Sequence, residues 1–137
     1  MAENITGGCD CGAIRYESRA APFLMVECQC LHCQKDSGTG HASHVLFARS
    51  EVTVTGAASS WDMLGDSGTT KTRAFCPACG TAVYGTFAAQ PDVLAVRAST
   101  LDDPSLYKPD FATYHARAQV WDHLDPALKT YDIMPPG

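Results

Sequence analysis

Short stretches in which apolar and polar residues alternate run through most of this chain, and this pattern is typical of half-buried β-strands. Apolar positions with helical spacing are almost absent, apart from one helical turn predicted from the Asp103 cap and Pro104 through Tyr107. We therefore predict a mainly β fold with little helix. The predicted strands cover residues 13–17, 23–30, 44–47, 52–55, 61–64, 71–76, 81–87, 93–98 and 111–120.

The connections between these strands lead to three further expectations. Strands 44–47 and 52–55 are close enough in sequence to form a hairpin. Gln90-Pro91-Asp92 indicates a loop, because its residues favour turns. Residues 1–6 are expected to be a lead-in that ends in a turn at Gly7-Gly8.

Length and composition indicate one domain spanning residues 1–137, with 45% hydrophobic and 18% charged residues. The net charge of −5 argues against binding to nucleic acid or an anionic membrane, because both need clustered Lys and Arg. No secretory leader and no apolar stretch of membrane-spanning length is visible. We therefore expect a cytoplasmic protein. The pattern makes no prediction about oligomeric state.

All seven cysteines fall into three clusters: Cys9-x-Cys11, Cys28-x-Cys30-x-x-Cys33 and Cys76-x-x-Cys79. An odd number of thiols cannot pair completely in disulfides, and a reducing compartment disfavours disulfides altogether. Clustered cysteines therefore indicate metal binding. In the triplet, strand alternation puts the first two sulfurs on one face, and a turn through Leu31-His32 can bring the third to the same point.

The ligand count separates two kinds of site. Four thiolates close a tetrahedral zinc site, whereas three protein ligands leave a coordination position open. We predict two zinc ions, a structural one held by the two cysteine pairs and a catalytic one held by the triplet. Two alternatives stay open. The second half of the triplet could join Cys76 and Cys79 as a zinc ribbon, or a histidine could close the triplet site, the candidates being His32, His41 and His44.

A zinc ion held by three thiolates is a weak Lewis acid and favours another soft ligand in its open position. We therefore predict a small thiol as substrate, activated as its thiolate. No nucleophilic triad, phosphate-binding loop or pair of acid/base carboxylates stands out. Trp61 and Trp121 are expected in the core.

An acidic protein that binds an acidic thiol needs local positive charge. Arg73 is the preferred substrate anchor, because arginine can bind a carboxylate through two parallel hydrogen bonds. The polar loop 34–40 contains Gly38, which would allow close approach by a ligand. The cationic candidates are Lys35, Arg49, Lys71 and Arg73.

Three segments together resemble the glutathione-dependent formaldehyde-activating enzyme (Gfa) family, which also includes centromere protein V. The first is Gly8-Cys9-Asp10-Cys11-Gly12-Ala13-Ile14-Arg15-Tyr16, the second is the triplet followed by Lys35 and Gly38, and the third is Arg73-Ala74-Phe75-Cys76-Pro77-Ala78-Cys79-Gly80-Thr81. Residues 99–104 and the region of Trp121 are similar as well, so the resemblance spans most of the chain.

The resemblance implies an Mss4-like fold of packed antiparallel sheets with two zinc sites. It assigns Cys9, Cys11, Cys76 and Cys79 to structural zinc, and Cys28, Cys30 and Cys33 to catalytic zinc. The implied activity is that of a carbon–sulfur lyase that forms S-hydroxymethylglutathione from glutathione and formaldehyde, with Arg73, Lys35 and Gly38 at the substrate.

Two other functions remain as alternatives. One is a carrier that holds glutathione, another thiol or zinc on the same scaffold without turnover. The other is a methionine sulfoxide reductase, one class of which shares the Mss4-like fold. That chemistry needs a cysteine free of metal, and the predicted site assignment leaves none.

Overall fold

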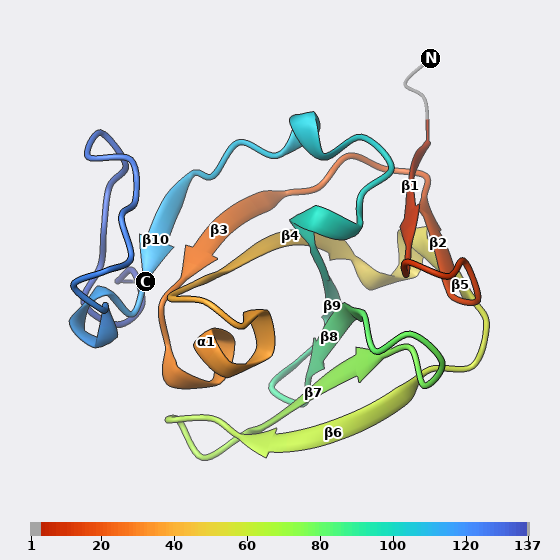
Figure 1. Ribbon diagram of the computed structural model, residues 1–137, viewed down its shortest axis with the longest axis horizontal. Helices are drawn as coiled ribbons and strands as arrows, with labels where there is room; N and C mark the ends of the chain where they lie inside the picture. The colour runs from red at the N-terminus through yellow and green to blue at the C-terminus, as the bar shows by residue number, and fades with distance from the viewer. Residues whose placement is uncertain (1–3, 137) are drawn as a thin grey trace.

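Two β-sheets form the framework of the computed structural model, which describes residues 4–136 (Figure 1). The three-stranded sheet is antiparallel with the order β1-β2-β5. Its strands are β1 (Ile5–Gly8), β2 (Arg15–Ser18) and β5 (Val52–Thr55).

The seven-stranded sheet has the order β10-β3-β4-β9-β8-β7-β6 and is antiparallel except for the pairing of β10 with β3. The prediction of a mainly β fold of antiparallel sheets is confirmed. The strands of the seven-stranded sheet are β3 (Leu24–Cys28), β4 (Ala42–Ala48), β6 (Ser59–Leu64), β7 (Thr70–Phe75), β8 (Ala82–Phe87), β9 (Gln90–Arg97) and β10 (Phe111–Thr113).

Helical structure in the described part of the chain consists of α1 (Leu31–Ser37) and short 3-10 turns. The turn predicted at Asp103 is present, and the Asp103 carboxylate accepts a hydrogen bond from the Ser105 amide. No helix within residues 4–136 is long and apolar enough to cross a membrane. The 3-10 turns are η1 (Arg49–Glu51), η2 (Ala98–Thr100), η3 (Pro104–Leu106) and η4 (His115–Arg117).

The predicted hairpin of strands 44–47 and 52–55 is wrong, because the two strands belong to different sheets. Strand β4 pairs with β3 and β9, whereas β5 pairs with β2. The turn η1 between them carries the chain from the larger sheet to the smaller one (Figure 1). Closeness in sequence favours hairpins, but pairing with distant strands decides the topology here.

Three boundaries also differ from the expectation. Gln90-Pro91-Asp92 forms the start of β9 rather than a loop. The strand expected over 111–120 stops at Thr113, because Tyr114 adopts a left-handed conformation with φ of 56°. Gly7 and Gly8 lie inside β1, where a Cβ on Gly7 would stand 2.2 Å from the Tyr16 hydroxyl. The expectation for residues 1–3 lies outside the described residues.

The main core lies where the two sheets meet. Buried Ile14 and Tyr16 from the smaller sheet and its turn pack in one cluster with Val45 and Phe47 of β4 and with residues of β8 and β9. The Tyr16 hydroxyl is 2.8 Å from the Thr100 hydroxyl, so this buried polar group has a partner. Cys9 and Cys76 belong to the same buried cluster.

We expect Gly56→Ala to destabilise the fold much more than Gly68→Ala. Both glycines have positive φ, 97° and 83°, so alanine is strained at either by about 1–2 kcal/mol. At Gly56 the new Cβ would also stand 2.1 Å from the Ala13 carbonyl oxygen, whereas at Gly68 it would meet nothing within 4 Å. The difference in unfolding free energy, measured by urea denaturation, isolates the contact. Equal losses for the two variants would contradict the close approach of Gly56 to residue 13.

Candidate metal centres and the residues around them

The four cysteines of the two pairs come together at the junction of the sheets. Cys9 and Cys11 lie in the turn between β1 and β2, and Cys76 and Cys79 lie in the turn between β7 and β8. All four sulfurs lie within 4.8 Å of one another. The zinc-ribbon alternative, which pairs Cys76 and Cys79 with part of the triplet, is not the arrangement observed.

The geometry of this cluster suits a tetrahedral metal ion. A zinc ion with Zn–S bonds of about 2.3 Å separates its sulfurs by roughly 3.8 Å. The Sγ atoms of Cys9 and Cys11 are 3.7 Å apart, and those of Cys11 and Cys76 are 3.6 Å apart. Backbone amides donate to the sulfurs of Cys9 and Cys76, and the hydrogen bond from the Ile14 amide lowers the pKa of Cys9.

The triplet forms a second cluster at the start of α1. Cys28 ends β3, Cys30 caps the helix by accepting a hydrogen bond from the Cys33 amide, and Cys33 faces inward from the first turn. The three sulfurs lie within 4.8 Å of one another and are nearly buried. A helix of seven residues was not expected here, because two turns are too short to show a periodic pattern.

The three sulfurs of the triplet strongly affect one another's pKa values. Hydrogen bonds from Cys28 and Cys33 lower the pKa of Cys30 to about 2. The Cys30 contact raises the pKa of Cys28, and contacts with both other sulfurs raise that of Cys33. The three sulfurs therefore do not ionise independently of one another. A divalent cation would allow all three to ionise, so the donor set fits a soft metal ion.

The histidines proposed as a fourth ligand do not join the cluster. Within residues 4–136, no histidine nitrogen lies within 4.8 Å of all three sulfurs. His44 contacts one sulfur of the triplet, since its Nε2 atom lies 3.4 Å from the Cys33 sulfur. Burial, aided by the charge of Arg97, lowers the pKa of His44 to about 3, so its ring is neutral. His41 makes other contacts, described below.

Two of the predicted cationic residues line a single groove of about 220 Å³ beside α1. Lys35 comes from the helix and Arg73 from β7, although 38 positions separate them in sequence. Arg73 Nη1 also lies 3.5 Å from Asp36 Oδ1. Lys71, two residues before Arg73, lowers the pKa of Cys30 through its charge. The remaining lining residues are His32, Trp61, Met63 and Leu64.

The two tryptophans are not in the core, contrary to the expectation. Trp61 is 61% exposed and Trp121 is 58% exposed. Trp61 lies on β6, the edge strand of the larger sheet, and contributes to the Lys35–Arg73 groove. An aromatic residue in a strand pattern does not by itself reveal that the strand is at an edge. Arg49 lies on η1 and does not line this groove.

The glycines after α1 have structural reasons of their own. Gly38 ends the helix with φ of 77°, and a Cβ there would meet nothing within 4 Å. Gly40 lets another part of the chain approach, since its Cβ would stand 2.3 Å from Asp122. The role of Gly38 in ligand approach therefore stays a prediction.

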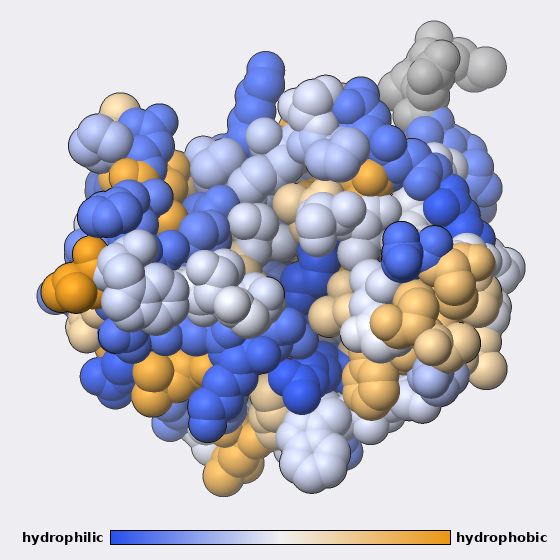
Figure 2. All heavy atoms as spheres, viewed as in Figure 1, coloured by the Kyte–Doolittle hydropathy of each residue, from blue (hydrophilic) through white to orange (hydrophobic). Residues whose placement is uncertain are grey.

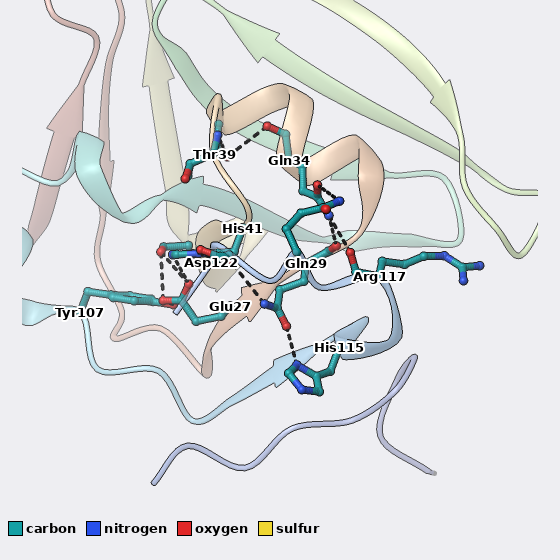
Figure 3. A network of polar contacts seen from close by, with 12 residues as sticks. Glu27, Gln29, Gln34, Thr39, His41, Tyr107, His115, Arg117 and Asp122 are labelled. Carbon is teal, nitrogen blue, oxygen red and sulfur yellow. Dashed lines mark hydrogen bonds and ion pairs between the residues drawn. The ribbon is translucent and has the colours of Figure 1, made fainter. Parts of the chain in front are cut away.

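A buried network of polar side chains connects the end of β3 and Gln29 with the C-terminal segment (Figure 3). The ring nitrogens of His41 contact two carboxylates, Nε2 at 2.9 Å from Glu27 and Nδ1 at 2.8 Å from Asp122. These carboxylates are only 8% and 6% exposed. Both ring nitrogens of His41 therefore have a carboxylate partner within this network. Tyr107 and Ser43 also donate to Glu27.

Gln29 connects this network to the triplet. It stands between Cys28 and Cys30 and is completely buried. Its amide nitrogen donates to Asp122 at 3.1 Å, and its amide oxygen lies 2.8 Å from His115 Nδ1 (Figure 3). The C-terminal segment thereby holds the loop that carries the sulfurs. The sequence analysis missed this network, because its members are far apart along the chain and form no motif.

Tyr114 is a second residue that the sequence analysis missed. It packs against the triplet sulfurs, and burial raises the pKa of its hydroxyl. It is also the one described residue other than glycine with a positive φ. Such strained backbone is common at functional sites, where the surrounding structure stabilises it.

Hydrophilic residues gather around a hollow near the middle of the face drawn in Figure 2, over α1 and β9. A pocket of about 350 Å³ is lined there by residues of α1, β4 and β9, among them Asp36, His41 and Arg97. Arg97 pairs with Asp36. The charged side chains of this pocket are already paired, Asp36 with Arg97 and His41 with Glu27 and Asp122.

Comparison with known proteins identifies similar sequences and folds. The model of the glutathione-dependent formaldehyde-activating enzyme family matches residues 4–117. A crystal structure of a Rhodobacter sphaeroides protein, a structural-genomics target, superimposes with a TM-score of 0.60 at 21% identity, covering 76% of this chain and 96% of that chain. At this identity the likeness shows the fold alone. The search of curated proteins finds no match.

We expect His41→Leu to destabilise the protein by about 3 kcal/mol, because it removes a hydrogen-bonding partner from two buried carboxylates. Urea denaturation at neutral pH measures the loss. His123→Leu is the matched control, because His123 is exposed, and it should change stability by less than about 0.5 kcal/mol. A His41→Leu variant as stable as the control would show that the contacts of His41 with Glu27 and Asp122 do not stabilise the fold.

Proposed function

The chain belongs to the glutathione-dependent formaldehyde-activating enzyme family, and on that basis we propose that it is a zinc-dependent carbon–sulfur lyase-type enzyme. Its substrate would be glutathione or a related thiol, which it joins to formaldehyde as the S-hydroxymethyl adduct or releases from that adduct. The observation that carries this proposal is the three-sulfur cluster of the triplet, whose helix also contributes Lys35 to a groove shared with Arg73.

We propose zinc as the metal of both cysteine clusters. Cys9, Cys11, Cys76 and Cys79 supply four sulfurs and would close a structural site. Cys28, Cys30 and Cys33 supply three and would leave one position for the substrate. Zinc bound to the triplet would keep a substrate sulfur deprotonated near neutral pH.

The reaction needs no oxidant or reductant. The substrate thiol loses its proton, and its sulfur attacks the carbonyl carbon of formaldehyde. A carbon–sulfur bond forms as the carbon–oxygen π pair moves to oxygen, which then takes up a proton. One proton leaves sulfur and one arrives at oxygen, so the addition is balanced. The reverse reaction releases formaldehyde and thiol.

The charges of the groove suit a substrate with carboxylates. Glutathione carries a carboxylate at each end, and Lys35 and Arg73 would bind them from opposite sides of the groove. Arg73 uses only part of its five donors on Asp36, so it retains donors for a ligand. Trp61 offers an exposed aromatic surface along the same groove. Free thiols and a glutathione substrate both suit a reducing cytoplasm.

We expect Cys30→Ser to lower the turnover of S-hydroxymethylglutathione by at least about 100-fold, because the serine hydroxyl is a poor ligand for a soft metal site. NMR of the adduct, glutathione and formaldehyde measures the rate in both directions. Metal analysis should find two zinc ions per chain in the unmodified protein and one in the variant.

Thermal unfolding checks that the variant is folded. If folded Cys30→Ser turns over the adduct at the unmodified rate, the catalytic assignment of the triplet is wrong. If the unmodified protein binds glutathione but accelerates no reaction across a panel of aldehydes, it is a carrier rather than an enzyme.

We expect Arg73→Met to weaken glutathione binding by roughly 10–100-fold, the effect of losing a charge-assisted hydrogen bond. Isothermal titration calorimetry with glutathione measures the affinity. Arg49→Met removes an equal charge from an exposed position outside the groove and should change the affinity by less than about twofold. Equal losses in the two variants would indicate a general effect of net charge and contradict the anchoring role of Arg73.

A further inference from the structure

Four side chains form a continuous hydrogen-bonded chain that ends on one sulfur of the triplet. Asp36 accepts from two nitrogens of Arg97, Nε at 2.8 Å and Nη2. The Nη1 atom of Arg97 lies 3.2 Å from His44 Nδ1. The Nε2 atom of His44 lies 3.4 Å from Cys33 Sγ.

The positions of the protons in this chain follow from its first member. A guanidinium group only donates hydrogen bonds, so His44 Nδ1 must be the acceptor in its contact with Arg97. In the neutral ring the single hydrogen then sits on Nε2, which faces the Cys33 sulfur. The contact between His44 and Cys33 is therefore an N–H···S hydrogen bond, with the histidine as donor.

The surroundings hold this tautomer in place. The side chains of Asp36 and Arg97 are only 5% and 11% exposed, so neither can easily exchange its partner for water. Asp36 also contacts Arg73, so its carboxylate is held from two sides. The participating residues come from α1, β9 and β4, three elements whose packing sets the distances.

We propose that His44 is a positioning residue that tunes the sulfur of Cys33 and makes it unlike the sulfurs of Cys28 and Cys30. This inference rests on the proposed metal at the triplet. A hydrogen bond to a thiolate withdraws electron density from sulfur, so Cys33 is a weaker donor to a metal ion than its neighbours. A metal held by one weakened and two strong thiolates binds a further thiolate more readily.

The same proton assignment argues against His44 as a metal ligand. A ligating nitrogen must offer a lone pair, but Nε2 carries the hydrogen and Nδ1 receives that of Arg97. A site closed by His44 would need a lone pair on Nε2, whereas the proposed open site needs a hydrogen on that atom.

Two substitutions of His44 test its contact with Arg97 separately from its contact with Cys33. His44→Asn keeps an amide oxygen near the position of Nδ1, so it can still accept from Arg97, but it is too short to reach Cys33. His44→Gln places an amide N–H near the position of Nε2 and can replace the donor. His123→Asn, at an exposed position, is the control for loss of an imidazole.

Cobalt substitution provides the readout, because Co²⁺ occupies zinc sites and shows sulfur-to-metal charge-transfer bands. We expect His44→Asn to move the charge-transfer bands of the triplet site to lower energy, because the Cys33 sulfur without its hydrogen bond is a stronger donor. His44→Gln should restore the bands towards their position in the unmodified protein. The bands of the four-cysteine cluster should be the same in all variants.

The proposal is overturned if His44→Asn, with two metal ions bound, has the charge-transfer bands of the unmodified protein. It is also overturned if the ligand-field bands of both His44 variants lose the signature of a nitrogen ligand, because His44 would then be the fourth ligand. If the unmodified protein binds only one metal ion, the proposed function and the tuning of Cys33 both fail. A failure confined to the spectra of His44→Asn leaves the proposed function intact.

Discussion

The joining of two sheets by four cysteines is the constraint on which the rest of this structure depends. The turn with Cys9 and Cys11 belongs to the three-stranded sheet, and the turn with Cys76 and Cys79 belongs to the seven-stranded sheet. Two of these sulfurs are part of the apolar core between the sheets. Four thiolates at such distances repel one another unless a cation neutralises them, so a metal ion bound at this junction would couple its binding to folding.

The three sulfurs of the triplet also oppose one another's ionisation, but the residues around them differ from those around the four-cysteine cluster. Its sulfurs are held between the end of β3 and the start of α1, and two nearby arginines share one carboxylate, that of Asp36. Asp36 is the centre of this arrangement, because it binds Arg97 on one side and Arg73 on the other. It thereby connects the helix with β9 and β7, and it orients both the arginine that faces the groove and the one that faces His44.

The C-terminal segment contacts residues that flank the triplet. Asp122 reaches both His41 and Gln29, and Gly40 leaves the space that its carboxylate occupies. Gln29, whose contacts Figure 3 shows, stands in the chain between Cys28 and Cys30. Residues close to the end of the chain therefore help to hold the loop of the triplet, although no sulfur belongs to them. A fully satisfied buried network of this kind favours one arrangement of the backbone over its alternatives.

The sequence by itself determined the fold class, the grouping of the sulfurs and the family, because these depend on local patterns. Alternation marked most strands, and the spacing of Cys28, Cys30 and Cys33 on a strand and a turn was enough to bring their sulfurs together. Only the tertiary structure decided which strands pair, which sheet edge exposes Trp61, and which partners His41 and His44 contact. These properties depend on contacts between residues far apart in the chain, which no local pattern records.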